Sequence, residues 1–150
     1  PIFAKARSLG IPGVSHAGEH GGPAEVIFAV EQFQAQRIQH GIGVMSDPIA
    51  VALLVDNAIP CDVCPGSNLA LHAVESAEAH PLPQMLDAGI IVTIGTDDPP
   101  MFQTNLLDDY QRAWDWCGLD EAGIGQLARN SIQASFALDA HKQRWLADLG

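Results

Sequence analysis

Residues 90–100, with the sequence IIVTIGTDDPP, decide how this chain folds. Their first five positions are apolar or β-branched, which is typical of a strand buried on both faces, as in parallel sheets. The run stops at Gly95, and Thr96, Asp97 and Asp98 follow it before two prolines. Reactive side chains therefore come directly after a buried strand, at the end where α/β folds keep their sites.

The same arrangement occurs three times upstream. Strands are predicted at residues 11–15, 37–40 and 58–63, in addition to 90–94. Helices are predicted at residues 2–9, 24–36, 49–57, 80–88, 106–117, 120–130 and 139–149. Four strand–helix repeats fit a small doubly wound sheet or half of an eight-stranded barrel. Because the polar residues fall at the carboxyl ends of strands, the half barrel is favoured: an α/β fold with four parallel strands and a helical C-terminal tail.

Composition limits the class of protein. The chain has 150 residues, of which 47% are hydrophobic, and this is enough for one domain with a core. No apolar run approaches the roughly 20 residues of a membrane helix, and the N-terminus lacks the features of a signal peptide. Three cysteines do not pair evenly, which favours reduced thiols and a cytoplasmic setting.

The charge distribution argues against nucleic acid as a partner. The net charge is −11, and Arg37 is the only basic residue between Arg7 and Arg112. A protein that follows phosphate backbones presents a basic stripe, which this sequence lacks. The same scarcity argues against a phosphorylated substrate, although a helix N-terminus holds phosphate without any cation. A neutral ligand fits better.

Two histidines and three carboxylates are expected to meet at the carboxyl ends of the strands. The sequence HAGE at residues 16–19 follows the first strand, His40 ends the second, and Asp97 and Asp98 follow the fourth. Taken alone, His16 is explained as a structural histidine, and an aspartate before proline as a helix N-cap. Together they predict a catalytic metal site, which needs at least three protein ligands and an open position.

The order and spacing of these residues resemble the C-terminal half of the adenosine deaminase family, within the metal-dependent amidohydrolase superfamily. The matching residues are His16-Ala17-Gly18-Glu19, His40-Gly41, Cys64-Pro65 with Ser67-Asn68, and Thr96-Asp97-Asp98-Pro99. The resemblance covers nearly the whole chain, and a complete barrel needs about 250 residues. Residues 1–150 are therefore expected to be a single partial domain, the last four βα units of a TIM barrel without its N-terminal half.

The resemblance implies a zinc cofactor and catalytic roles for four residues. His16 and Asp97 would bind Zn²⁺, which lowers the pKa of bound water toward neutrality. His40 would help to orient and deprotonate this water. Glu19 would protonate the purine ring nitrogen next to the attacked carbon.

The resemblance also implies the substrate. Asp98 would hydrogen-bond the five-membered ring of a purine, and Gly18 would contact the substrate as well. The implied reaction converts adenosine, a neutral purine nucleoside, to inosine and ammonia. Free adenine, a modified adenine nucleoside such as aminodeoxyfutalosine, and an inactive barrel fragment remain alternatives. The oligomeric state is left open.

Some positions depart from the family pattern. The family's His-x-His pair of zinc ligands has no counterpart in this sequence. Gln39 stands where glycine is usual, and Gln103 stands where a smaller residue is common. Both lie near the expected pocket, so these departures bear on the identity of the substrate more than on the chemistry.

Three other features have simpler explanations. Cys61 and Cys64 form a C-x-x-C, but Cys61 lies inside a predicted strand, so the two thiols are expected to face opposite ways and not to form a redox pair. His80 is expected at the surface or at a helix cap. Asp108 and Asp109 are expected on a solvated helix face.

Overall fold

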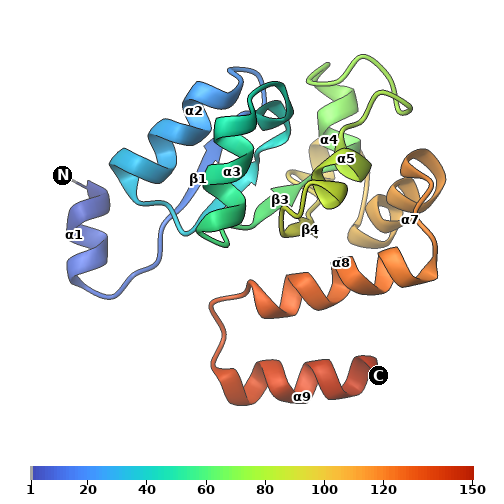
Figure 1. Cartoon of the computed structure of the whole chain (residues 1–150). Coiled ribbons are helices and arrows are strands. Elements are labelled where there is room, and N and C mark those ends of the chain that lie inside the picture. The colour runs from blue at the N-terminus through green and yellow to red at the C-terminus, as the bar shows by residue number, and fades with distance from the viewer. Residues whose placement is uncertain (1) are drawn as a thin grey trace.

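Four parallel strands form one sheet in the computed structural model, which describes residues 2–150 (Figure 1). The strands are β1 (Val14–Ala17), β2 (Arg37–His40), β3 (Cys61–Val63) and β4 (Val92–Ile94). Their order in the sheet is β1-β2-β3-β4, and each neighbouring pair is parallel. The predicted α/β fold with four parallel strands and C-terminal helices is confirmed.

Three of the four strands begin later in the chain than predicted, whereas β2 begins at Arg37 as expected. β1 starts at Val14, where the pairing of Val14 with Arg37 begins, and it includes His16. β3 starts at Cys61 because Pro60 has no N–H to donate to a neighbouring strand. The predicted positions of these strands were right, but their first residues were not.

Short helices connect the strands and were only partly predicted. After β1 come α2 (Pro23–Phe28) and the π-helical turn η1 (Ala29–Phe33), where one longer helix was expected. After β2 come the 3₁₀ turn η2 (Ile42–Ser46) and α3 (Pro48–Asp56). After β3 come α4 (Pro65–Ala70) and α5 (Leu82–Asp87), of which only α5 was expected.

The helices outside the strand–helix repeats agree with the predicted ranges, except for α6, which was not predicted. They are α1 (Ile2–Ser8), α6 (Pro99–Phe102), α7 (Leu106–Cys117), α8 (Glu121–Gln133) and α9 (Asp139–Leu149). α7 begins where the Asn105 side chain accepts a hydrogen bond from the Asp108 N–H at 3.1 Å. α8 packs along β4, where the Asn130 amide donates to the Val92 carbonyl at 2.8 Å (Figure 1).

Asp109 on α7 corrects the expectation of a solvated helix face. The side chain is fully buried and accepts a hydrogen bond from the Gly66 N–H at 2.8 Å. It also pairs with Arg112 at 3.2 Å. Gly66 belongs to α4, so this carboxylate joins two helices, whereas Asp108 is partly exposed.

The register of the sheet separates an apolar row from a polar one. Aligned side chains in a parallel sheet share a face. The apolar row Ile38, Cys61 and Val92 is buried in the same hydrophobic cluster as residues of α2, α3, α5 and α8. The next row along the strands is polar and consists of His16, Gln39, Asp62 and Thr93. Of the side chains predicted to be reactive, His16 therefore belongs to the face away from the main apolar core, whereas His40 lies in the following row, opposite Ala17.

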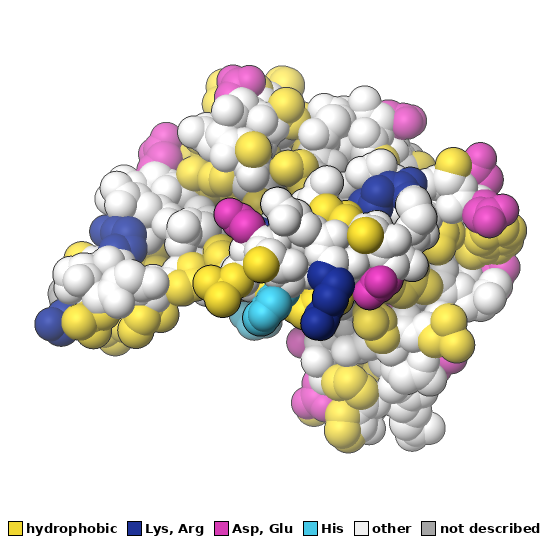
Figure 2. Space-filling model, turned by 90° about the horizontal axis from the view of Figure 1, so that it is seen from below, with side chains coloured by type: hydrophobic (Ala, Val, Ile, Leu, Met, Phe, Trp, Pro, Cys, Tyr) yellow, Lys and Arg dark blue, Asp and Glu magenta, His cyan; other side chains and the backbone are white. Residues whose placement is uncertain are grey.

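The surface mixes charged and apolar side chains. Figure 2, seen from below Figure 1, shows hydrophobic side chains exposed between scattered charges on this face. Trp145 and Leu149 of α9 are among the exposed apolar residues of the chain. Within residues 2–150, no helix has both the length and the apolar character required to cross a membrane.

Candidate active site

Three side chains from three strand ends converge at the carboxyl rim of the sheet. His16, His40 and Asp97 each offer one ligand atom, and these atoms lie within 4.8 Å of one another. His16 lies on β1, His40 is the last residue of β2, and Asp97 follows β4. His40 is buried, whereas the other two residues are exposed. Parallel pairing brings residues that are far apart in sequence to one edge, as predicted.

The backbone turns sharply at two of these positions. His40 has φ 69° and Asp97 has φ 57°, so both lie in the left-handed region. Residues other than glycine rarely adopt this conformation, and it costs on the order of 1–3 kcal/mol at each position. The turns direct both side chains away from the regular pleat of the strand, into the cluster with His16.

Glu19 lies next to this cluster. Its Oε2 atom is 3.6 Å from Nε2 of His40. Within the described chain, Glu19 Oε1 and His40 Nε2 are buried without a hydrogen-bond partner. Buried polar atoms are nearly always paired, so two unpaired atoms at one place indicate a site for a bound molecule.

Gly18 lets the chain pass from His16 to Glu19. Its φ is 67°, and a Cβ atom there would lie 2.7 Å from Cγ2 of Val26. No larger residue fits this contact without a shift of the packed Val26. The sequence prediction that this glycine permits a sharp turn is therefore confirmed, while its contact with substrate stays a prediction.

The electrostatic environment of His40 favours the neutral ring. Burial lowers the pKa of His40, and the neighbouring Glu19 and Asp97 carboxylates oppose this effect. The positive forms of His16 and His20 add to the lowering. A neutral imidazole has one N–H donor and one acceptor nitrogen, and its hydrogen bonds decide which is which.

Ser67 holds the Asp97 carboxylate, a role that the sequence did not predict. Its hydroxyl donates to Asp97 Oδ2 at 2.6 Å, and the residue is fully buried at the start of α4. A ligand carboxylate fixed in this way keeps its orientation for a metal. Its position in the polar stretch directly after β3 is the one sequence feature that could have indicated this role.

Asn68 and His80 form a second layer behind His40. Asn68 Nδ2 lies 3.1 Å from His40 Nδ1, and Asn68 Oδ1 lies 3.4 Å from His80 Nε2. All three residues are buried. The expectation of a surface position for His80 is wrong, whereas that of a cap is supported, because its ring accepts from the Leu82 N–H at the start of α5.

Asp98 lies at the rim but does not join the cluster of possible ligands. Its carboxylate accepts from the Met101 N–H at 3.3 Å and caps α6. The residue is exposed. The structure thus shows the capping role that Asp98 was given as the simpler explanation, and its contact with a purine stays a prediction.

The two cysteines of the C-x-x-C motif are buried in different surroundings. Burial raises the pKa of the Cys61 thiol far above its usual range and that of Cys64 to about 12. The Gln39 amide lies 3.4 Å from Cys64 Sγ, whereas the Cys61 side chain packs beside Gly41. Thiolate, the reactive form, is scarce for such groups near neutral pH, so a redox role is not supported.

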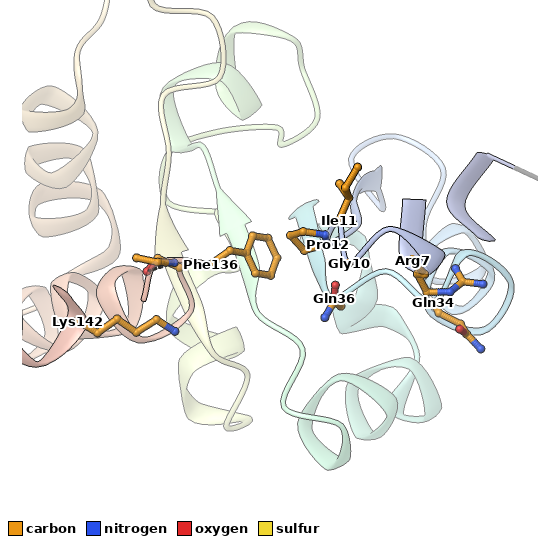
Figure 3. Close-up of a pocket in the computed structure, with 10 residues that line it drawn as sticks. Arg7, Gly10, Ile11, Pro12, Gln34, Gln36, Phe136 and Lys142 are labelled. Carbon is orange, nitrogen blue, oxygen red and sulfur yellow. Dashed lines mark hydrogen bonds between the residues drawn. The ribbon is translucent and has the colours of Figure 1, made fainter. Parts of the chain in front are cut away.

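A large hollow lies at the other end of the strands. It has a volume of about 720 Å³ and is lined by the segments before β1 and β2 and by the α8–α9 connection. Figure 3 shows Phe136 pointing across this hollow toward Ile11 and Pro12. The rim residues His16, His40 and Asp97 are not among those that line it, so the hollow and the candidate active site are separate.

Comparison with known sequences gives one family for nearly the whole chain. The family model described as adenosine deaminase matches residues 1–149. An aminodeoxyfutalosine deaminase from Streptomyces avermitilis is 43% identical over 149 residues, covering 99% of this chain and 42% of the relative. An adenine deaminase from Streptomyces coelicolor is 39% identical over 150 residues, covering 99% of this chain and 44% of the relative. The chain thus spans less than half the length of these relatives.

Comparison with solved structures gives related enzymes. An adenine deaminase from Arthrobacter aurescens superposes with a TM-score of 0.95 and 35% identity, covering 99% of this chain and 45% of that one. An amidohydrolase from Burkholderia ambifaria, with bound Zn, gives a TM-score of 0.89 at 26% identity, covering 98% of this chain and 42% of that one. The predicted relationship to part of a TIM-barrel enzyme is confirmed.

Proposed function

Since this chain belongs to the adenosine deaminase family, we propose that it supplies the proton-transferring half of a zinc-dependent deaminase for an adenine-containing small molecule. The observation that carries the proposal is the meeting of His16, His40 and Asp97 within 4.8 Å, beside Glu19. These groups come from three separate strand ends. A purely structural role does not explain why two unpaired buried polar atoms lie among them.

The residues present fit a zinc ion. Imidazole nitrogen and carboxylate oxygen are common zinc ligands, and His16 and Asp97 offer one of each on the open side of the cluster. Ser67 orients the carboxylate, as such partners do in known metal sites. A bound zinc would supply a Lewis acid that lets water attack near neutral pH. We propose that His16 and Asp97 hold it and that the two remaining protein ligands lie outside these residues.

The other side chains handle the water and the protons. We propose that His40, with Nε2 buried and facing the cluster, orients the attacking water. Glu19 lies on the same side and would donate a proton to the purine ring nitrogen. Water supplies the new oxygen on the ring carbon, the carbon–nitrogen bond breaks, and the amino group leaves as ammonia.

The relatives favour a substrate other than adenosine. Named relatives at 43% and 44% identity are aminodeoxyfutalosine deaminases, and one at 39% is an adenine deaminase. We therefore propose aminodeoxyfutalosine as the first candidate substrate and free adenine as the second. Gln39 before the buried His40 supports a pocket that differs from that of adenosine deaminases, in which glycine is usual at this place.

The test is a comparison of three substrates with one enzyme preparation. Ammonia release by the complete zinc-loaded protein is measured with aminodeoxyfutalosine, adenine and adenosine at equal concentrations. We expect the highest kcat/KM with aminodeoxyfutalosine. A preference for adenine would move the assignment to the second candidate, and a preference for adenosine would reject both. Failure of all three substrates, in a preparation that contains zinc, would refute the deaminase proposal.

A further inference from the structure

A continuous line of buried hydrogen bonds runs from the start of α5 to the candidate active site. The Leu82 N–H donates to His80 Nδ1 at 3.2 Å. His80 Nε2 lies 3.4 Å from Asn68 Oδ1, and Asn68 Nδ2 lies 3.1 Å from His40 Nδ1. The far nitrogen of His40, Nε2, faces Glu19 at 3.6 Å. His40 and Asn68 are fully buried, and His80 is 2% exposed.

The first bond fixes the direction of all the others. A backbone N–H only donates, so His80 Nδ1 must be the acceptor nitrogen of that ring. A neutral ring then carries its proton on Nε2 and donates to the Asn68 carbonyl oxygen. This orients the Asn68 amide, whose NH₂ group faces His40 Nδ1 and makes it an acceptor. The single proton of neutral His40 is left on Nε2.

We infer that Asn68 and His80 are positioning residues, which keep the His40 proton on Nε2 and present this N–H to the candidate active site. In this tautomer His40 donates a hydrogen bond to an oxygen at the site. It has no free electron pair on Nε2, so it is neither a third metal ligand nor the acceptor of a proton from water. Of the three groups that meet at the rim, this leaves His16 and Asp97 as the metal ligands.

The neutrality of His80 is consistent with this assignment. Burial lowers the pKa of His80 to about 4, so its ring carries one proton at neutral pH. A doubly protonated His80 would leave the Leu82 N–H facing another donor inside the protein, which is costly. The catalytic consequence for His40 rests on the proposed function, but the position of the proton rests only on these hydrogen bonds.

The direct test is nitrogen NMR of the histidine rings in the metal-free, complete protein. With ¹⁵N-labelled histidine, two-bond ¹H–¹⁵N spectra distinguish protonated from unprotonated ring nitrogens, and His40→Asn and His80→Asn spectra assign the signals. We expect Nε2 to be protonated and Nδ1 unprotonated in both rings. A proton on Nδ1 of His40 would overturn the inference. Because no turnover is measured, this outcome is independent of whether the protein is a deaminase.

Zinc addition tests the second half of the inference in the same sample. We expect the His16 ring nitrogen signals to change on binding and the His40 Nε2–H signal to persist. Loss of the His40 Nε2 proton on zinc binding would show that His40 is a ligand and would overturn the assignment.

Asn68→Asp tests whether the hydrogen bond from Asn68 to His40 fixes the position of the His40 proton. An aspartate there offers only acceptor oxygens to His40 Nδ1, so we expect the His40 proton to move to Nδ1 and kcat to fall about 10–100-fold with little change in KM. Asn57→Asp makes the same change at an exposed helix end and should alter neither. If Asn68→Asp does not fold, His80→Phe removes the donor that orients Asn68, and we expect signals of both His40 tautomers. An unchanged His40 spectrum in a folded variant would contradict the inference.

Discussion

Glu19 brings to the rim a carboxylate oxygen that is buried without a partner in the described chain. If this carboxyl is the proton donor, replacement by an amide of the same shape should remove its function and leave the metal ligands in place. We expect Glu19→Gln to lower kcat about 10²–10⁴-fold with zinc still bound. The check is steady-state kinetics together with zinc content by atomic absorption.

The matched control for this change is Glu31→Gln, which alters an exposed glutamate on η1. It should leave both kcat and zinc content unchanged. Full turnover by the Glu19→Gln variant would exclude Glu19 as the proton donor.

Ser67 makes one short hydrogen bond to Asp97, and that bond has a measurable consequence. Ser67→Ala leaves the Asp97 carboxylate free to rotate, so the zinc affinity should fall about 10–100-fold. Competition with a chromophoric chelator measures this directly. Ser8→Ala, at an exposed position of α1, serves as the control. Equal zinc affinity in the two variants would show that Ser67 does not orient the ligand.

At the scale of residues, the sequence predicted the side chains that face the rim but not those behind them. His16 and His40 lie at the carboxyl ends of β1 and β2, and Asp97 follows β4. Because parallel strands end at a common edge, their meeting follows from topology. The positions of Asn68 and His80 relative to His40 depend on how α4 and α5 pack. No local pattern carries that information.

Among the helices, α7 is tied to α4 by one buried carboxylate. Asp109→Ala removes the acceptor of the Gly66 N–H and leaves Arg112 without its partner. Breaking such a buried pair should lower the free energy of unfolding by about 3 kcal/mol. Asp108→Ala, at the partly exposed neighbouring position, should cost less than about 1 kcal/mol. Urea denaturation of both variants compares them, and equal losses would contradict the assignment.

The segment before α5 makes the stability depend on pH through His80. The pKa of its ring is 6.5 in the unfolded chain and about 4 in the folded one. Between pH 6.5 and pH 4, His80 is protonated in the unfolded chain but stays neutral in the folded one. The free energy of unfolding therefore falls as the pH drops toward 4, by at most about 3 kcal/mol. Urea denaturation at pH 7 and pH 4.5 should show a smaller loss for His80→Gln than for the unchanged protein. Identical losses would rule out this contribution.

Long helices were predicted well from the periodicity of their apolar residues, whereas short helices were predicted poorly. α7 and α9 have twelve and eleven residues and agree with the predicted residues 106–117 and 139–149. α4 and α6 have six and four residues, too few for a helical period to show in the sequence. The π-helical turn η1 depends on tertiary packing, so one continuous helix was predicted there instead.

At the scale of the whole molecule, the number of metal ligands matters most. A catalytic zinc needs at least three protein ligands, and His16 and Asp97 supply two. We therefore expect residues 1–150 alone to lose zinc on dialysis against a chelator and to release little ammonia. The complete protein should retain the metal and turn over under the same conditions. Tight zinc binding by residues 1–150 alone would show that these residues contain the full set of ligands.

The left-handed backbone at His40 and Asp97 has a consequence for the molecule as a whole. Glycine would occupy either position without strain, so the chain keeps a side chain there against the preference of its own backbone. Each reactive group thus lowers the stability of the scaffold that displays it. A sequence selected only for thermal stability would have glycine at both positions. The protein is therefore less stable than its fold would allow.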